Sequence, residues 1–99
     1  MKGNSLNDFI NDMYHAFEKE FIYKGRYFII QNETRGDKSF IRLDEYPLDK
    51  SKNYVESEYL SLEIEGDSFE ECAKKLLMTK IIDGKNIYEL EKDIEVIYG

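Results

Sequence analysis

The stretch EFIYKGRYFIIQ, Glu20 to Gln31, contains two runs of aromatic and β-branched residues joined by Lys24-Gly25. Such runs are typical of β-strands, and a glycine in a two-residue link is typical of a tight hairpin turn. A turn at this link pairs Tyr23 with Arg26 and places apolar groups on both faces of the ribbon. The pattern therefore predicts a hairpin that lies centrally in a sheet, or in a sheet that is covered on both sides.

An amphipathic helix is predicted before the hairpin, over residues 6–19. Its apolar residues recur at the spacing of one helical face, and Ser5 precedes them as an N-cap with Asp8 three positions later. The only histidine, His15, lies about 180° from Leu6 at about 100° per residue, so we expect it to face solvent.

Further strands are predicted after the hairpin. Residues 31–38 form a polar turn, residues 39–43 a short third strand, and residues 44–53, with the only proline, a long loop. Residues 54–64 then alternate between apolar and polar side chains, which predicts a half-exposed antiparallel strand.

Helical signals return in the last third of the chain. Ser68 begins a capping box ahead of an apolar stripe that includes Cys72, so we expect a helix with a buried, unreactive thiol. Asp83-Gly84 is a turn signal, and Asn86 is placed to cap a second helix over residues 87–93. Residues 94–98 suit either a helix or a closing strand, and the spacing of Ile94 and Ile97 favours the helix.

Length and composition limit the architecture. The chain has 99 residues, 41% of them hydrophobic, and a single cysteine. This predicts one α+β domain over residues 1–99, a small antiparallel sheet of three to four strands packed by an N-terminal helix and one or two C-terminal helices. With no possible internal disulfide, no secretory signal pattern and no run of about 18 apolar residues, we expect a cytoplasmic protein that does not enter membranes.

The net charge of −7 is concentrated in the second half of the chain. Residues 1–52 hold 9 acidic and 9 basic side chains, whereas residues 53–99 hold 12 acidic and 5 basic ones. Seven carboxylates and no lysine or arginine lie between Glu56 and Glu71. Such a segment repels polyanions, so direct binding of nucleic acid is not expected.

Most catalytic and cofactor chemistry is excluded by the residue inventory. One histidine and one cysteine on different predicted helices supply neither a catalytic triad nor a His/Cys metal site. No phosphate-binding loop or dinucleotide fingerprint occurs. We therefore expect no catalytic, cofactor-binding or metal-binding residues, and acid–base chemistry by paired carboxylates is the only enzymatic route left.

The carboxylates on and next to the predicted strand at residues 54–64 support a more specific hypothesis about function. Alternate residues of a strand are about 6.8 Å apart on one face, twice the ~3.4 Å advance per phosphate of a nucleic-acid strand. A row of carboxylates anchored by tyrosines would fit a basic groove on a partner protein. The predicted partner-binding residues are Tyr54, Glu56, Glu58, Tyr59, Glu63 and Glu65.

The hairpin Glu20-Phe-Ile-Tyr-Lys-Gly-Arg-Tyr-Phe-Ile, the segment Ser68-Phe-Glu-Glu and the late segment Ile82-Asp-Gly-Lys-Asn-Ile-Tyr-Glu-Leu together carry a resemblance. The chain resembles small uncharacterised proteins from phages and other mobile elements of low-GC Gram-positive bacteria. These motifs are turn and core signatures, and Asn86-Ile87 departs from the Thr/Ser-Leu expected after the lysine. The resemblance implies an accessory protein and transfers no catalytic residue.

Two functions are expected from these observations. The first is a small acidic, non-enzymatic accessory protein, a monomer or a homodimer, that binds a protein partner and inhibits a host defence or nucleic-acid-binding protein by charge mimicry. The alternative is a domain that binds a nucleotide or small ligand in a pocket under the loop at residues 44–53, with acid–base catalysis as its activity.

Overall fold

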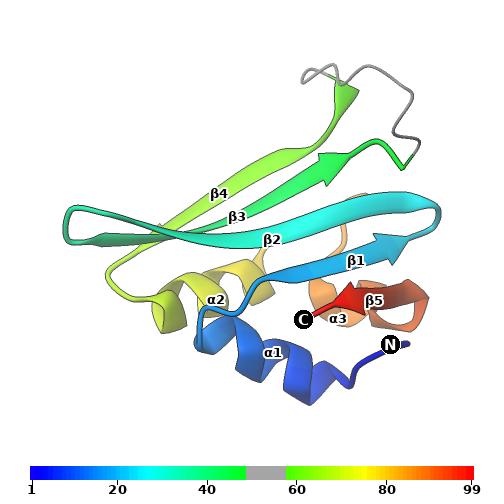
Figure 1. Cartoon of the computed structure of the whole chain (residues 1–99), viewed down its shortest axis with the longest axis horizontal. Helices are drawn as coiled ribbons and strands as arrows, with labels where there is room; N and C mark the ends of the chain where they lie inside the picture. Colours follow the sequence, from blue (N-terminus) through cyan, green and yellow to red (C-terminus); the bar gives the residue numbers. More distant parts are fainter. Residues whose placement is uncertain (49–57) are drawn as a thin grey trace.

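The computed structural model describes residues 1–48 and 58–99. It shows a five-stranded antiparallel sheet in the order β4-β3-β2-β1-β5, with the helices gathered on one of its faces (Figure 1). The strands are β1 (Lys19–Tyr23), β2 (Arg26–Arg35), β3 (Lys38–Tyr46), β4 (Ser61–Gly66) and β5 (Ile94–Tyr98). The helices are α1 (Leu6–Tyr14), α2 (Phe69–Met78) and α3 (Ile87–Leu90), the last followed by the 3₁₀ turn η2 (Glu91–Asp93). The predicted α+β class is confirmed, but the sheet has one strand more than the three to four expected.

The predicted hairpin is confirmed in both position and register. Tyr23 pairs with Arg26 and Phe21 with Phe28 across β1 and β2. Lys24 and Gly25 both have positive φ, 47° and 75°, as a two-residue turn that follows the twist of its strands requires. β2 is the middle strand of the sheet, so the hairpin lies centrally, while helices cover only one of its faces.

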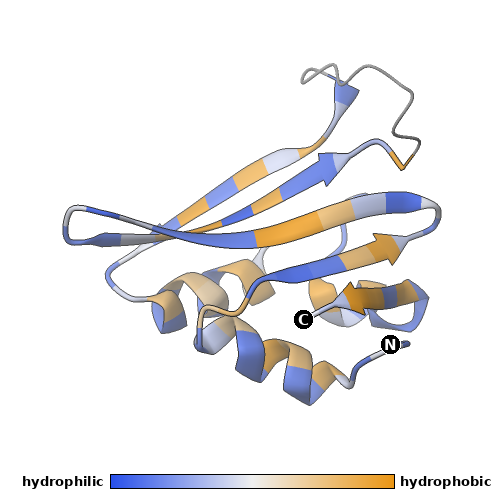
Figure 2. Ribbon diagram, viewed as in Figure 1, coloured by the Kyte–Doolittle hydropathy of each residue, from blue (hydrophilic) through white to orange (hydrophobic). Residues whose placement is uncertain are grey.

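The core lies between the sheet and the helices, and Figure 2 shows hydrophobic residues along both the strands and the helices. Phe21 and Phe28 are fully buried neighbours with ring centroids 5.2 Å apart, and Phe9 of α1 meets Phe21 edge to face at 6.1 Å. Each fully buried aromatic side chain contributes about 3 kcal/mol by removal of apolar surface from water. These rings therefore hold α1 against the hairpin.

Helix α1 is shorter than predicted. Ser5 caps it, its Oγ accepting from Asp8 N at 3.1 Å, and His15 is exposed as expected. The helix ends at Tyr14, however, and Ala16 takes a positive φ of 60° that turns the chain toward β1. The expected helical residues 15–19 thus form a turn and the start of a strand, because Lys19 is the first residue of β1 and pairs with Ile30 of β2.

Strands β2 and β3 are longer than predicted. The expected polar turn at residues 31–38 is reduced to Gly36-Asp37, and residues 31–35 continue β2. Polar side chains are compatible with this strand because one face of the sheet is uncovered. On that face the guanidinium of Arg35 stacks on the ring of Phe40 at 3.7 Å. The third strand likewise extends over residues 38–46, so the expected loop begins after Tyr46, and its residues 49–53 lie outside the described part of the chain.

The predicted strand at residues 54–64 is confirmed only in its second half. β4 begins at Ser61, residues 58–60 are not part of it, and residues 54–57 lie outside the described ranges. Within β4 the predicted alternation holds, with Leu62 and Ile64 half-buried on the helix side and Glu63 exposed on the other.

The C-terminal third confirms two helices and corrects one prediction. α2 is capped by Ser68 and buries Cys72, and Asn86 and Glu89 form a reciprocal capping box at α3. Residues 94–98, for which a helix was favoured, form strand β5 instead. The reason is tertiary, since β1 offers an unpaired edge and Ile94 and Val96 fit beside Tyr23 and Phe21 over the core.

Candidate functional site

The predicted partner-binding residues are only partly described by the structure. Tyr54 and Glu56 lie outside the described residues. Glu58 is exposed and Tyr59 half-buried in the segment that leads into β4. The described carboxylates therefore do not form one continuous row, because residues 58–60 are not part of the strand.

Glu63 and Glu65 do share one face of an extended strand, as predicted. Both are exposed on the sheet face opposite the helices. A carboxylate oxygen of Glu63 lies 2.5 Å from Arg35 Nη2 and 4.0 Å from Arg42 Nε, so its charge is partly balanced within the sheet. Among residues 1–48 and 58–99, no cation lies within ion-pair distance of Glu65. Glu65 is thus the carboxylate of this strand most available to a partner.

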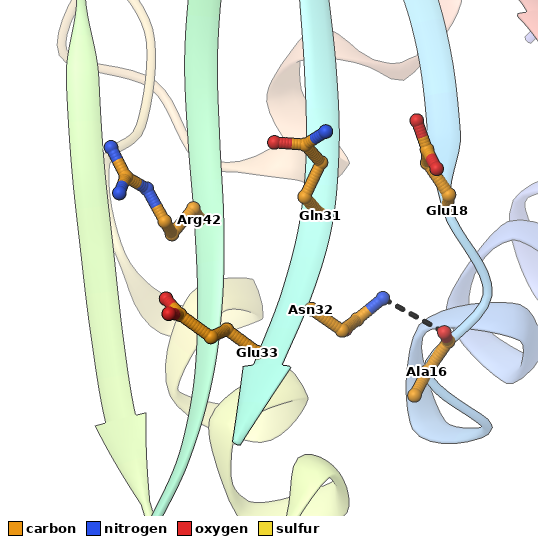
Figure 3. Close-up of a pocket in the computed structure, with 6 residues that line it drawn as sticks. All are labelled: Ala16, Glu18, Gln31, Asn32, Glu33 and Arg42. Atoms are coloured by element: carbon orange, nitrogen blue, oxygen red, sulfur yellow. Dashed lines mark hydrogen bonds between the residues drawn. The ribbon is translucent and has the colours of Figure 1, made fainter. Parts of the chain in front are cut away.

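A polar cleft of about 380 Å³ opens where β2 runs on past the start of β1 (Figure 3). Asn32 Nδ2 donates a hydrogen bond to the Ala16 backbone oxygen at 2.8 Å, whereas the buried Oδ1 of Asn32 has no hydrogen-bond partner among the described residues. The nearby Asp44 carboxylate raises the pKa of Arg42. The lining residues are Ala16, Glu18, Gln31, Asn32, Glu33 and Arg42.

This cleft was not predicted from the sequence. Its residues come from the chain after α1 and from strands β2 and β3, and the segment at residues 31–33 was predicted to be a turn. Only the observed strand extension places Gln31 and Glu33 on the same face as Arg42. The cleft can accept and donate hydrogen bonds, but Glu18 and Glu33 make it unfavourable for phosphate groups.

A second cavity lies under the first residues of the predicted loop, close to the position of the expected ligand pocket. It measures about 210 Å³, and two of the charged side chains that line it, Arg26 and Glu45, are bonded to each other. Arg26 donates to both carboxylate oxygens of Glu45 at 3.0 Å and to Asp83 at 2.9 Å. The backbone N–H of Leu60 donates to Glu45 at 3.2 Å. These bonds join the hairpin, β3, the residue before β4 and the turn at Asp83, so their role is structural.

The Arg26–Glu45 pair predicts a dependence of stability on pH. The hydrogen bonds from Arg26 hold the pKa of Glu45 below its ordinary value despite the opposing effect of burial. A carboxyl whose pKa is lower in the folded state stabilises the protein above its unfolded pKa and loses that contribution as pH falls. We expect the free energy of unfolding of the native protein to fall more steeply below about pH 5 than that of Glu45→Gln.

Urea denaturation between neutral and acidic pH measures this difference. The variant Glu89→Gln changes a carboxylate of the capping box elsewhere on the molecule and serves as the control. Parallel pH profiles for the native protein and Glu45→Gln would contradict the assignment.

The single cysteine is buried and the single histidine is exposed, as predicted. Cys72 Sγ is buried and donates to the backbone oxygen of Ser39 at 3.2 Å, and burial raises the pKa of its thiol. His15 is exposed after α1, where its Nδ1 lies 2.8 Å from the backbone oxygen of Asn11. Within the described ranges, no three His, Cys, Asp or Glu side chains are grouped to hold a metal ion, and no helix has the length and apolar character to cross a membrane.

Comparisons of the chain with protein-family models, curated proteins and solved structures found no match.

Proposed function

We propose that this protein is a non-enzymatic accessory protein that binds a protein partner through its acidic strand β4. The observation that supports this most is the exposure of Glu63 and Glu65 on the outermost strand, with Glu65 free of any ion pair within residues 1–48 and 58–99. Glu58 is exposed and Tyr59 half-buried in the segment that leads into β4. A basic patch on a partner is the complementary surface, because complementary charges increase both the association rate and the specificity of binding.

The partner class that fits is a protein with a basic binding surface, such as a nucleic-acid-binding protein. Inhibition of a host defence protein, which the resemblance to phage and mobile-element proteins implies, belongs to the same proposal. Close mimicry of a phosphate backbone receives less support, because the described carboxylates do not form one unbroken row. A cytoplasmic location is also part of the proposal, since the single cysteine is buried and unpaired.

The alternative, a small-ligand function, is favoured by one observation, the buried and unpartnered Asn32 Oδ1 beside the polar cleft. Because the carboxylates of Glu18 and Glu33 line the cleft, the ligand in that alternative would be a neutral or cationic polar molecule rather than a nucleotide.

The double variant Glu63→Gln/Glu65→Gln tests the proposed function. We expect it to retain less of the partner than the native protein does at low salt, with the difference reduced at high salt, because exposed charge pairs are screened. The measurement is quantitative affinity capture from the source cells at two salt concentrations, followed by binding assays with the identified partner.

The control is Glu91→Gln/Asp93→Asn, which removes the same net charge from η2. This turn precedes β5, the edge strand opposite β4. Equal capture by the native protein and the β4 variant at both salt concentrations would refute a role for the acidic strand. Equal losses in both variants would show that only net charge matters.

A further inference from the structure

The two edges of the sheet differ in how they are covered. The outer edge of β5 is bridged by the N-terminal segment, where Lys2 N donates to Ile94 O at 2.9 Å and Val96 N donates to Lys2 O at 2.8 Å. Gly3 makes this close approach possible, because a Cβ there would lie 2.3 Å from Val96 O. At the opposite edge of the sheet, no residue in the ranges 1–48 and 58–99 pairs with the outer edge of β4 (Figure 1).

The hydrogen-bonding pattern shows which backbone groups of β4 point outward. Leu60 O accepts from Glu45 N at 2.8 Å, so Leu60 points its backbone groups toward β3. Because these directions alternate along an antiparallel strand, Ser61, Glu63 and Glu65 point theirs away from β3. The side-chain bond from Lys75 Nζ to Glu65 O at 2.8 Å agrees with this orientation and occupies one outward acceptor. The other outward groups form a row that an added strand can pair with.

A groove of about 600 Å³ accompanies this edge between β4 and α2. Ile64 is half-buried in its wall, and Met78 at the end of α2 is 81% exposed. Lys74 and Lys75 border it and are paired with acidic residues one helical turn earlier on α2. The helix side of the edge thus presents apolar surface with bordering cations, whereas the open side presents Glu63 and Glu65.

We propose that β4 binds an extended segment of a partner protein as an added sixth strand, a segment in which basic and apolar residues alternate. Its basic side chains lie beside Glu63 and Glu65 on the open face. Its apolar side chains lie on the helix side, against Ile64 and Met78. Strand addition of this kind obtains affinity from main-chain hydrogen bonds and specificity from alternate side chains. The inference rests on the proposed function and specifies how the partner is bound.

A second copy of this chain does not fit the same edge. Antiparallel pairing of β4 with another β4 would bring Glu63 and Glu65 of one copy beside those of the other, within about 5.5 Å across the strands. Like charges placed directly opposite one another destabilise a strand pair. The charge of the strand therefore favours a basic partner segment over a homodimer.

The test uses the full chain labelled with ¹⁵N, and with ¹³C in the methionine methyl groups, and a six-residue peptide, acetyl-Val-Lys-Val-Lys-Val-Lys-amide, which matches the six residues of β4. Titration followed by NMR is expected to shift the backbone amides of β4 and the Met78 methyl group. The amides of Ser61, Glu63 and Glu65, whose N–H groups point away from β3, are expected to gain protection from hydrogen exchange. The peptide with glutamate in place of lysine is expected to bind at least about tenfold more weakly, because its carboxylates face those of β4.

Two variants separate main-chain pairing from charge. Glu65→Pro removes an outward N–H without removing a bond to β3, and we expect it to weaken binding of the lysine peptide by about tenfold relative to Glu65→Gln. Met78→Ser tests the apolar side of the groove on an exposed residue that the fold does not need. The amide spectrum of each variant shows whether the fold is retained.

Shifts confined to other surfaces, or equal affinities for Glu65→Pro and Glu65→Gln in folded protein, would overturn strand addition. Self-association of the chain, detected by sedimentation, would also overturn strand addition by a partner if two further results were found. These are that the lysine peptide leaves the association unchanged and that the β4 amides are protected in the associated form. If the peptide result is negative while partner capture still depends on Glu63 and Glu65, the proposed function stands and the added strand does not.

Discussion

Replacing Asp12 with alanine is expected to lower the free energy of unfolding by about 3–5 kcal/mol, as happens when one partner of a buried ion pair is removed. The ammonium of Lys19 is fully buried at the start of β1 and bonds to the carboxylate of Asp12 on α1. It also donates to the backbone oxygen of Gly99 at 2.7 Å and lies 5.8 Å from the centre of the Phe9 ring. Without Asp12, the buried ammonium would retain the Gly99 oxygen and the Phe9 ring as its contacts within residues 1–48 and 58–99.

The double variant Asp12→Ala/Lys19→Met is the control for this prediction. Replacing both partners of a buried pair with apolar groups is often neutral or stabilising, so we expect it to recover most of the lost stability. Urea denaturation followed by circular dichroism measures all three proteins. An equal loss in the single and the double variant would show that the pair contributes through packing rather than through its charge.

Replacing Phe21 with alanine is expected to lower the free energy of unfolding by about 3–5 kcal/mol, the usual cost of removing a buried phenylalanine. Phe21 is completely buried and its ring contacts both Phe9 and Phe28. The change would leave a cavity between the hairpin and α1, because a close-packed core collapses only partly around a deleted ring.

The matched control is Phe17→Ala, the same substitution at a ring that is 57% exposed. We expect this variant to change the free energy of unfolding by no more than about 0.5 kcal/mol, as for most surface substitutions. Denaturant midpoints and slopes from the same urea experiment distinguish the two variants. A similar loss at both positions would be inconsistent with a core centred on Phe21.

Local sequence signals gave correct predictions wherever short-range physics decides the outcome. The turn at Lys24-Gly25 and the register of its strands follow from the glycine and the flanking runs. The caps at Ser5, Ser68 and Asn86 follow from side chains that bond to nearby backbone N–H groups. These features involve residues only a few positions apart.

The errors share a cause, because each depends on pairing with another strand rather than on the pattern within one segment. Residues 94–98 have a spacing that also suits a helix, and β1 makes them a strand. Residues 31–35 are polar enough for a turn, and β3 holds them in the sheet. The helix expected to reach residue 19 ends early because the chain turns at Ala16 and Lys19 pairs with Ile30 of β2.

The candidate site likewise combines features that the local sequence predicts with features that depend on contacts between separate strands. The alternation of Glu63 and Glu65 with apolar residues, and therefore their shared face, could be predicted from the sequence, since a strand repeats every two residues. Their position on an edge strand beside α2, and the balancing of Glu63 but not Glu65 by Arg35 and Arg42, became evident only from the folded chain. Strand order and ion pairing across strands depend on which distant segments meet, and no local pattern in the sequence encodes that.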